Sequence, residues 1–363
     1  MKFFKYLFVL LSLILIVSCG GEEEEDDWGN DGDDGNSGNN EENGGWESRE
    51  DKPGKVLQTE GFLSISAIAI GLDDILYVGG ATKEESKKSD ALLVAFDTKG
   101  KELWKKQWDY QESADRINEV VTDKDGNIYV AGRSYNISFI IKFAPDGTKL
   151  WEQFLEYDNI FSLTLDSEQN IYTPYNNKIA KYSTDGKELW NNAVLETEQS
   201  KIQAIIVDSE KNIYLGGQSS ESLFADNAGK NDAFLKKITA DGTQVWGQQW
   251  GNSEDDYITS LMIDDDNKIY VSGKGTFFKV SSDGEKIWEI NQQCYFATIC
   301  NDNIYCINNN QIYKYNSNGE YLGSLVACEA DSLETIACDN KEKVYVSTTR
   351  STKIIKIPSS DIK

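Results

Sequence analysis

The sequence predicts an all-β protein, a β-propeller with seven four-stranded blades, on three observations. Short segments in which apolar and polar residues alternate recur with a period of 35–56 residues. An Ile-Tyr pair, or a close relative of it, marks one strand in each of seven successive units. An Asx-Gly turn recurs at one place in most units, and glycine supplies the positive φ that tight hairpins need. Such a period, with several short strands per unit, is typical of propeller blades and not of helical solenoids.

Each unit is predicted to form four strands, a to d. In the clearest unit, strand a covers residues 117–122, strand b surrounds Tyr129, strand c covers residues 139–143 and strand d contains Trp151. Period-two alternation between turn residues is the signature of such strands. The recurrent tyrosines are Tyr77, Tyr129, Tyr172, Tyr214, Tyr270, Tyr305 and Tyr345, and the recurrent tryptophans are Trp104, Trp151, Trp190, Trp246 and Trp288. We expect both sets to pack between blades as core residues and not to form a platform for sugar stacking.

The last unit lacks a strand d of its own. It has a strand b around Tyr345 and a strand c at residues 352–357, and the sequence ends soon afterwards. Before the first unit, residues 55–62 form a strand-like segment that no unit uses. We expect this N-terminal segment to complete the last blade as its outer strand, because that leaves no open edge in the ring. Six or eight blades remain alternatives, since the last two units are degraded.

The N-terminus carries an export signal. Lys2 and Lys5 precede an apolar run at residues 7–17, which is too short for a membrane span and fits a signal-peptide core. The run ends in Ile-Val-Ser-Cys, which resembles the bacterial lipoprotein box. The sequence therefore predicts a signal peptide over residues 1–18, lipidation of Cys19 and a place in the bacterial cell envelope, as an outer-membrane or cell-surface lipoprotein. The alternative is an ordinary signal peptide with a chance cysteine.

Residues 19–52 are predicted to form a flexible acidic tether ahead of a propeller domain at 53–363. Six consecutive acids at residues 22–27 are followed by a tract rich in Gly, Asn, Asp and Glu, and such a segment cannot bury enough apolar surface to order itself. An acidic stretch after a lipidated cysteine also resembles surface-export signals of some Bacteroidota lipoproteins. A solvated spacer is the alternative.

Charge and composition exclude several classes of function. The chain contains 36 Lys and Arg against 61 Asp and Glu, and a net charge of −25 argues against nucleic acid, whose binders must neutralise phosphate. The absence of histidine removes mechanisms with an imidazole base and metal sites that need a His ligand. Asp123 and Asp125 suggest calcium by composition, but turn formation explains them equally well. We therefore predict no catalytic residue, no metal site and no cofactor.

Part of the sequence resembles a known repeat. Residues 229–246 (GKNDAFLKKITADGTQVW), together with residues 249–257 and 269–273, are similar to the bacterial β-propeller repeat called SBBP. The Gly-Lys-x-Leu-Trp element also looks like PQQ-type propeller repeats, which occur in redox enzymes and in a lipoprotein scaffold of outer-membrane protein assembly. The resemblance implies a propeller over residues 55–363. It carries over no catalytic residue, because the shared motifs are turns and packing positions.

We expect function on the face that carries the b–c and d–a loops. These loops differ between units, and loops placed by a rigid scaffold usually carry function. The longest b–c loops cover residues 81–90 and 218–232, and the d–a loops are rich in acids. The candidate binding residues are Lys83, Lys87, Lys88, Asp115, Asp158, Glu254, Asp255, Asp256 and Asp331. An acidic mouth would favour cations, amines or a basic protein surface, and ordinary solvated loops are the alternative.

Five cysteines follow the predicted lipidation site, all in the last two units: Cys294, Cys300, Cys306, Cys328 and Cys338. We expect one or two disulfides there, because an exported protein meets an oxidising compartment in many bacteria. Five is an odd number, so one cysteine is free or pairs elsewhere, and the sequence does not give the connectivity. A metal cluster is disfavoured because no C-x-x-C pair is present.

Two functions stay open at this point. The first is a non-catalytic binding or scaffold lipoprotein, monomeric, that holds a protein or a glycan at its loop face. The second is an enzyme that acts on carbohydrate or uses a quinone cofactor, which would need convergent acids or a cofactor slot in the channel. The absence of histidine and the confinement of the repeat to packing positions favour the first.

Overall fold

The computed structural model describes most of the chain after residue 44. The described residues are 45–49, 54–82, 88–110, 113–156, 160–197, 199–328 and 331–363. The predicted signal peptide, the predicted lipidation site Cys19 and most of the predicted tether lie outside them. The candidate binding residues Lys83, Lys87 and Asp158 lie outside them as well.

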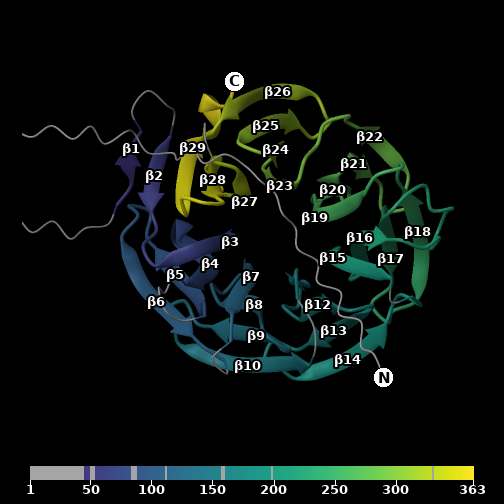
Figure 1. Ribbon diagram of the computed structural model, residues 1–363, viewed down its shortest axis with the longest axis horizontal. Helices are drawn as coiled ribbons and strands as arrows, with labels where there is room; N and C mark the ends of the chain where they lie inside the picture. Colours follow the sequence, from purple (N-terminus) through teal and green to yellow (C-terminus); the bar gives the residue numbers. More distant parts are fainter. Residues whose placement is uncertain are drawn as a thin grey trace, which may run out of the picture.

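Seven antiparallel sheets stand side by side in a closed ring around a central hollow (Figure 1). The seven-bladed propeller predicted from the sequence is therefore confirmed. In each of the first six blades, four strands follow one another along the chain, from the innermost strand at the channel to the outermost strand at the rim.

The innermost strands are β3 (Phe62–Ile70), β7 (Asp115–Thr122), β11 (Thr164–Leu165), β15 (Ser200–Val207), β19 (Tyr257–Ile263), β23 (Phe296–Cys300) and β27 (Leu333–Cys338). The second strands are β4 (Leu76–Thr82), β8 (Ile128–Ser134), β12 (Ile171–Tyr175), β16 (Ile213–Ser219), β20 (Ile269–Lys274), β24 (Asn303–Asn308) and β28 (Lys343–Thr348). The third strands are β5 (Ala91–Phe96), β9 (Ile137–Phe143), β13 (Lys178–Tyr182), β17 (Asp232–Ile238), β21 (Thr276–Val280), β25 (Gln311–Asn316) and β29 (Lys353–Pro358).

The outermost strands of blades one to six are β6 (Glu102–Trp108), β10 (Lys149–Glu156), β14 (Glu188–Ala193), β18 (Gln244–Trp250), β22 (Lys286–Glu289) and β26 (Tyr321–Val326). Blade seven ends with β2 (Lys55–Gln58) and β1 (Glu47–Ser48). Two short 3-10 helices, η1 (Leu72–Asp74) and η2 (Ser359–Asp361), complete the described elements.

The ring is closed by the N-terminal strand, as predicted. Strand β2 pairs antiparallel with β29, and Val56 lies opposite Ile355 in the register. The strand ends at Gln58, earlier than the predicted 62, because Phe62 already begins the innermost strand of blade one. First and last segments of the chain therefore share one sheet, and this shared sheet closes the ring.

A fifth strand in blade seven was not predicted. The sequence analysis assigned residues 45–49 to the tether, whereas the structure pairs β1 with β2. Trp46 explains the difference, because its ring packs on Tyr345 with the ring centroids 6.0 Å apart and lies 4.0 Å from the ammonium group of Lys356. One large aromatic side chain thus holds an otherwise polar segment on the propeller.

The recurrent tyrosines are buried in the core, as predicted. The tyrosines of the second strands are at most 4% exposed. In five blades the tyrosine meets the tryptophan of its own outermost strand, with ring centroids 5.8–6.1 Å apart. Trp46 and Tyr345 repeat this contact in blade seven, so the N-terminal segment supplies the tryptophan that the C-terminal unit lacks.

The turn between third and fourth strands explains the recurrent glycine. Gly147 has a φ of +79°, and a Cβ atom there would approach the ring of Trp104 in the preceding blade to 2.8 Å. The indole N–H of Trp104 donates to the carbonyl of Pro145 in the same turn, at 2.9 Å. Glycine is therefore required at this position for two reasons: the backbone conformation and the close packing of adjacent blades.

The aspartates that suggested calcium have a structural role. Asp123 accepts backbone N–H groups from Asp125 and Asn127 at 2.9 and 2.8 Å, and it accepts the hydroxyl of Tyr129 at 3.1 Å. The same tyrosine-to-aspartate bond recurs in four other blades, at Asp166, Asp208, Asp264 and Asp339. These carboxylates close the first turn in five of the seven blades and fix the tyrosine of the second strand there.

Candidate functional site

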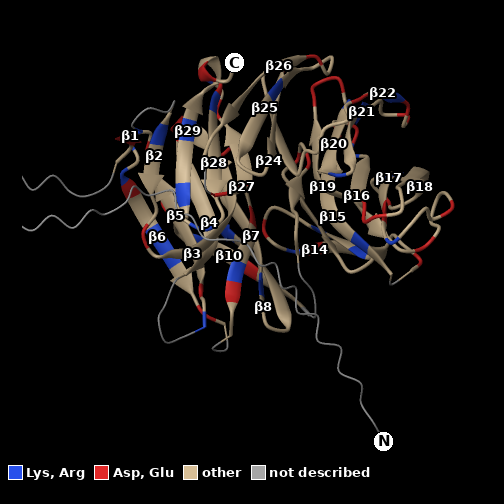
Figure 2. Cartoon of the chain, turned by 45° about the horizontal axis from the view of Figure 1, so that its top comes forward, with Lys and Arg blue, Asp and Glu red and all other residues tan. Residues whose placement is uncertain are grey.

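The propeller has two unlike faces. The turns between first and second strands and between third and fourth strands lie on one face and are short and repetitive. The loops between second and third strands, and between consecutive blades, lie on the other face, here called the loop face. Figure 2 shows charged residues gathered in loops and on outer strands, while the inner strands carry few.

Asp115 and Asp256, two of the predicted binding acids, are buried. Asp115 accepts the backbone N–H of Tyr110 and the hydroxyl of Ser113, and Asp256 accepts the backbone N–H of Asn252 at 2.8 Å. Their exposed fractions are 0% and 2%, and burial raises the pKa of both carboxyls. They organise the loops that enter β7 and β19 and present no charge to a ligand.

Asp331 plays the same part in blade seven. It is 7% exposed and accepts the hydroxyl of Thr349 and the backbone N–H of Ser351, the latter at 2.8 Å. Burial acts to raise the pKa of Asp331, but these hydrogen bonds outweigh it and lower that pKa. Each of these three carboxylates therefore accepts hydrogen bonds inside its own loop, and a role for them at a binding face stays a prediction.

The other described candidates are on the surface. Glu254 is exposed and pairs with Lys230 at 3.3 Å, while Asp255 accepts the side-chain N–H of Asn231 at 2.8 Å. Both contacts tie the long loop of blade four to the loop that enters blade five. Lys88 is exposed at the end of the blade-one loop. The structure thus places Glu254, Asp255 and Lys88 on the loop face but does not bring them to one point.

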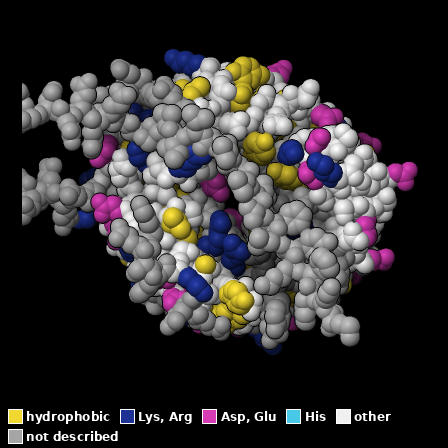
Figure 3. All heavy atoms as spheres, in the orientation of Figure 1, with side chains coloured by type: hydrophobic (Ala, Val, Ile, Leu, Met, Phe, Trp, Pro, Cys, Tyr) yellow, Lys and Arg dark blue, Asp and Glu magenta, His cyan; other side chains and the backbone are white. Residues whose placement is uncertain are grey.

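Two arginines lie together at the loop-face end of blade two, and their pairing was not predicted from the sequence. Arg116 on β7 and Arg133 on β8 are directly opposite each other in the antiparallel register. Figure 3 shows cationic side chains gathered at the centre of this face, beside the hollow of the ring. The signal was available in the sequence, since two of the four arginines fall in one repeat unit at positions that other units fill differently.

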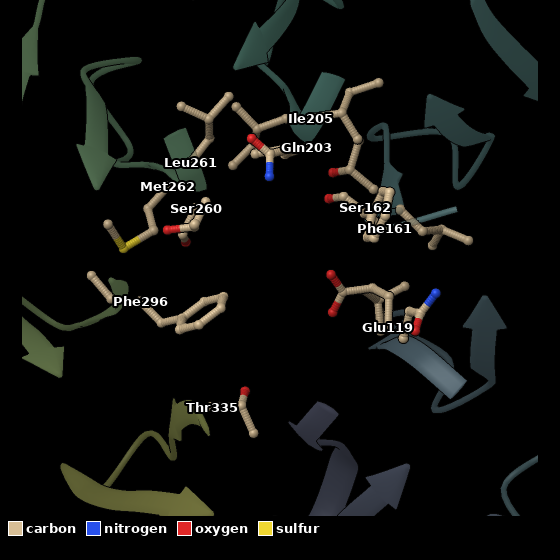
Figure 4. Close-up of a pocket in the computed structure, with 18 of the residues that line it drawn as sticks. Glu119, Phe161, Ser162, Gln203, Ile205, Ser260, Leu261, Met262, Phe296 and Thr335 are labelled. Atoms are coloured by element: carbon tan, nitrogen blue, oxygen red, sulfur yellow. The ribbon is translucent and has the colours of Figure 1, made fainter. Parts of the chain in front are cut away.

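The central channel holds a cavity of about 290 Å³, lined by all seven blades. Glu119 of β7 and Phe296 of β23 point into it from opposite sides, and Ser162, Gln203 and Thr335 add polar groups (Figure 4). Glu119 is the one acid among the lining residues. Desolvation raises its pKa to about 8, which keeps the carboxyl protonated at neutral pH.

Two disulfides lie in the last two blades. Cys294 is joined to Cys306 within blade six, and Cys300 is joined to Cys338. The second bridge connects β23 with β27, the innermost strands of adjacent blades. Cys328 is buried, with 4% of its surface exposed. The bridges therefore lie in the part of the ring where the sequence repeat is most degraded.

Metal and membrane features are lacking in the described segments. Across those segments, no three Cys, Asp or Glu side chains gather in a way that could hold a metal ion. Nor does any helix within them have the length and apolar character needed to cross a membrane.

A family profile matches part of the chain. The profile of the family described as outer membrane protein assembly factor BamB, built on PQQ-like repeats, matches residues 89–233. The match runs from blade one into blade four. PQQ-like repeats form this part of the propeller. No curated protein gives a significant match to the sequence.

Solved structures match the whole ring at low identity. A catalytically inactive virginiamycin B lyase from Staphylococcus aureus is 12% identical, with a TM-score of 0.61, over 83% of this chain and 96% of that one. A chain of the mitotic checkpoint complex is 9% identical, with a TM-score of 0.65, over 90% and 96%. The WD40 propeller domain of Doa1 is 11% identical, with a TM-score of 0.62, over 86% and 99%. An enzyme and non-enzymatic propellers are thus similar to the same degree, and the likeness shows the fold alone.

Proposed function

We propose that the protein is an exported, membrane-anchored lipoprotein of the cell envelope whose propeller binds a protein or a glycan at its loop face without catalysis. Lipidation of Cys19 would supply the anchor, and the acidic segment after it would hold the propeller away from the membrane. We further propose that the repeats are of the SBBP type and that the propeller acts as a monomer. The partial match to an outer-membrane assembly factor is compatible with this place in the cell.

The observation that carries the proposal is how the two faces use their side chains. On the turn face the recurrent aspartates, tyrosines and tryptophans satisfy one another within and between blades. On the loop face, Tyr135 stands at the tip of the β8–β9 hairpin with 82% of its surface exposed, next to the exposed Arg133. Exposed tyrosine and arginine are the residue types that most often anchor protein interfaces.

The channel gives less support to an enzyme. Glu119 has the raised pKa expected of a general acid, but glycoside hydrolysis by the common mechanisms needs a second carboxyl group across the scissile bond. No other acid is found among the residues that line the cavity. Binding therefore accounts better than hydrolysis for this arrangement.

Photo-crosslinking in intact cells tests the proposal. A photoreactive phenylalanine analogue replaces Tyr135 on the loop face in one strain and Tyr321 in another. Tyr321 is the matched control, because it is also an exposed tyrosine, at 58%, but lies on the outermost strand β26.

A partner captured from position 135 and not from position 321 would support the proposal. The alternative that the ligand is a glycan is tested by measuring binding of the purified protein to immobilised cell-surface polysaccharide. If position 135 captures nothing and no polysaccharide binds, a loop-face binding function is wrong.

A further inference from the structure

Two arginines lie opposite each other at the loop-face ends of β7 and β8. Arg116 and Arg133 are register partners across β7 and β8, where Ile117 pairs with Gly132 next to them. Arg116 donates to the hydroxyl of Ser66 in blade one at 3.0 Å. Within the described residues, neither guanidinium forms an ion pair, and the buried Nε of Arg116 has no hydrogen-bond acceptor.

This arrangement is unfavourable for the free protein. Like charges directly opposite on antiparallel strands destabilise the pair. Burial lowers the pKa of Arg116, and the charge of Arg133 lowers it further. Glu334 in blade seven is the nearest source of compensation, but its own carboxyl is partly desolvated and burial raises its pKa. The two positive charges are therefore incompletely neutralised by the protein itself.

The other blades avoid this arrangement at the equivalent register position. Blade one pairs Ser64 with Ala81, blade four pairs Lys201 with Gln218, and blade five pairs Tyr257 with Lys274. Each of these pairs contains at most one charge. The fold therefore does not require two cations at this register position. Blade two differs from these three blades in carrying two positive charges there.

We propose that Arg116 and Arg133 bind an oxyanion, a carboxylate, phosphate or sulfate group carried by the ligand of the loop face. Two guanidinium groups offer planar sets of N–H donors that match the oxygens of such groups. An anion would also convert the repulsion between the arginines into attraction for both.

The location makes the site selective. The chain has a net charge of −25, so anions are repelled from most of its surface. Cationic side chains gather near the centre of the face drawn in Figure 3, although the chain as a whole is acidic. The inference rests on the proposed function only in assigning the anion to the loop-face ligand, since the site itself is defined by blade two.

Selective ¹⁵N-arginine labelling of the purified protein tests the site directly. The chain has four arginines, so four side-chain Nε–H signals are expected. Sulfate, phosphate and glucuronate are titrated separately at constant ionic strength. The signals of Arg116 and Arg133 should shift with saturation, whereas that of Arg49, which donates to the carbonyl of Ala327, should not. The oxyanion that binds most tightly identifies the source of the group.

Three variants complete the test. Arg133→Gln should weaken binding by about tenfold or more and should not lower the Tm, because it removes a repulsion. Arg133→Lys keeps the charge but loses the planar fork, and binding should weaken to an intermediate degree. Lys201→Gln is the matched control, at the same register position in blade four, and should bind like the wild type.

Equal shifts of all four arginine signals, or unchanged binding by Arg133→Gln, would show general screening and overturn the inference. A loss of binding in Lys201→Gln as large as in Arg133→Gln would overturn it too. The outcome is independent of photo-crosslinking at Tyr135. A loop-face partner without anion binding would refute this site alone, and anion binding without a partner would leave the site standing while the proposed function fails.

Discussion

Glu119 shows how one residue in the channel links protonation to stability. Its pKa is raised from 4.5 to about 8 because its carboxyl is desolvated between the blades. Between these two values the unfolded chain has released the proton and the folded chain still holds it. The folded state therefore binds more protons, and the stability that Glu119 contributes is lost as the pH rises toward 8.

The variant Glu119→Gln should remove this pH dependence. Glutamine keeps the shape and stays neutral, so the free energy of unfolding of the variant should fall by about 3–4 kcal/mol less than that of the wild type between pH 5 and pH 8. Urea denaturation at a series of pH values measures the difference. Glu254→Gln, on the exposed loop face, serves as the control. Parallel curves for wild type and Glu119→Gln would contradict the prediction.

The tyrosine hydroxyls of the second strands contribute one hydrogen bond to each of five turns. In Tyr214→Phe the carboxylate of Asp208 loses a donor inside the core, and the free energy of unfolding should drop by about 1–2 kcal/mol. Tyr77→Phe is the matched control. Tyr77 is as buried as Tyr214, but Gly71 occupies the position that the aspartate holds in five other blades. Loss of the Tyr77 hydroxyl should therefore change the free energy of unfolding very little. Equal losses in both variants, measured by chemical denaturation, would contradict this account.

At the scale of the element, the N-terminal strands decide whether the ring closes. Trp46 is the contact that holds β1 on blade seven, through Tyr345 and Lys356. We expect Trp46→Ala to lower the free energy of unfolding by about 2 kcal/mol, less than for a fully buried tryptophan. Trp28→Ala, in the predicted tether, is the control and should have no effect in the same urea titration.

The two disulfides should differ in their contribution. The Cys300–Cys338 bridge spans 38 residues and joins two blades, whereas Cys294–Cys306 spans 12 residues within one. On the loop-entropy estimate, removing the longer link costs about 1 kcal/mol more than removing the shorter one. The comparison requires the paired alanine variants of each bridge, unfolded by urea under identical conditions. A larger loss for the shorter bridge would show that strand packing, not chain entropy, sets the cost.

The elements themselves were largely predictable from sequence. Asx-Gly turns and the repeated tyrosine and tryptophan fix strand order, because each has a local conformational or packing reason that repeats in every blade. Strand β1 was not predicted because its polar, acidic flanks show no strand pattern. One side chain, Trp46, holds it on blade seven through Tyr345 and Lys356. The loops could not be predicted in the same way. From sequence alone, an aspartate such as Asp115 is interpreted as an exposed acid. Its burial becomes clear only when the loop conformation shows that the backbone N–H of Tyr110 donates a hydrogen bond to its carboxylate.

At the scale of the molecule, the local charge of one region is opposite in sign to the net charge of the chain. A chain of net charge −25 carries an arginine pair at the loop-face end of blade two and, among the described residues that line its channel, one acid, Glu119, whose pKa is raised. We predicted an acidic mouth because many loop residues are acids. In the structure, the carboxylates of Asp115, Asp256 and Asp331 accept backbone N–H groups of their own loops.

The closing sheet also makes the ring vulnerable at one place. The connection between β2 and β3, residues 59–61, follows the two N-terminal strands directly. A protease that cut there would break the main chain between the propeller and the strands β1 and β2, which would then stay on blade seven through sheet pairing and packing. Dissociation of these two strands would release the propeller from the proposed anchor and weaken the fold in a single step, so the shed product would be short-lived compared with the tethered protein.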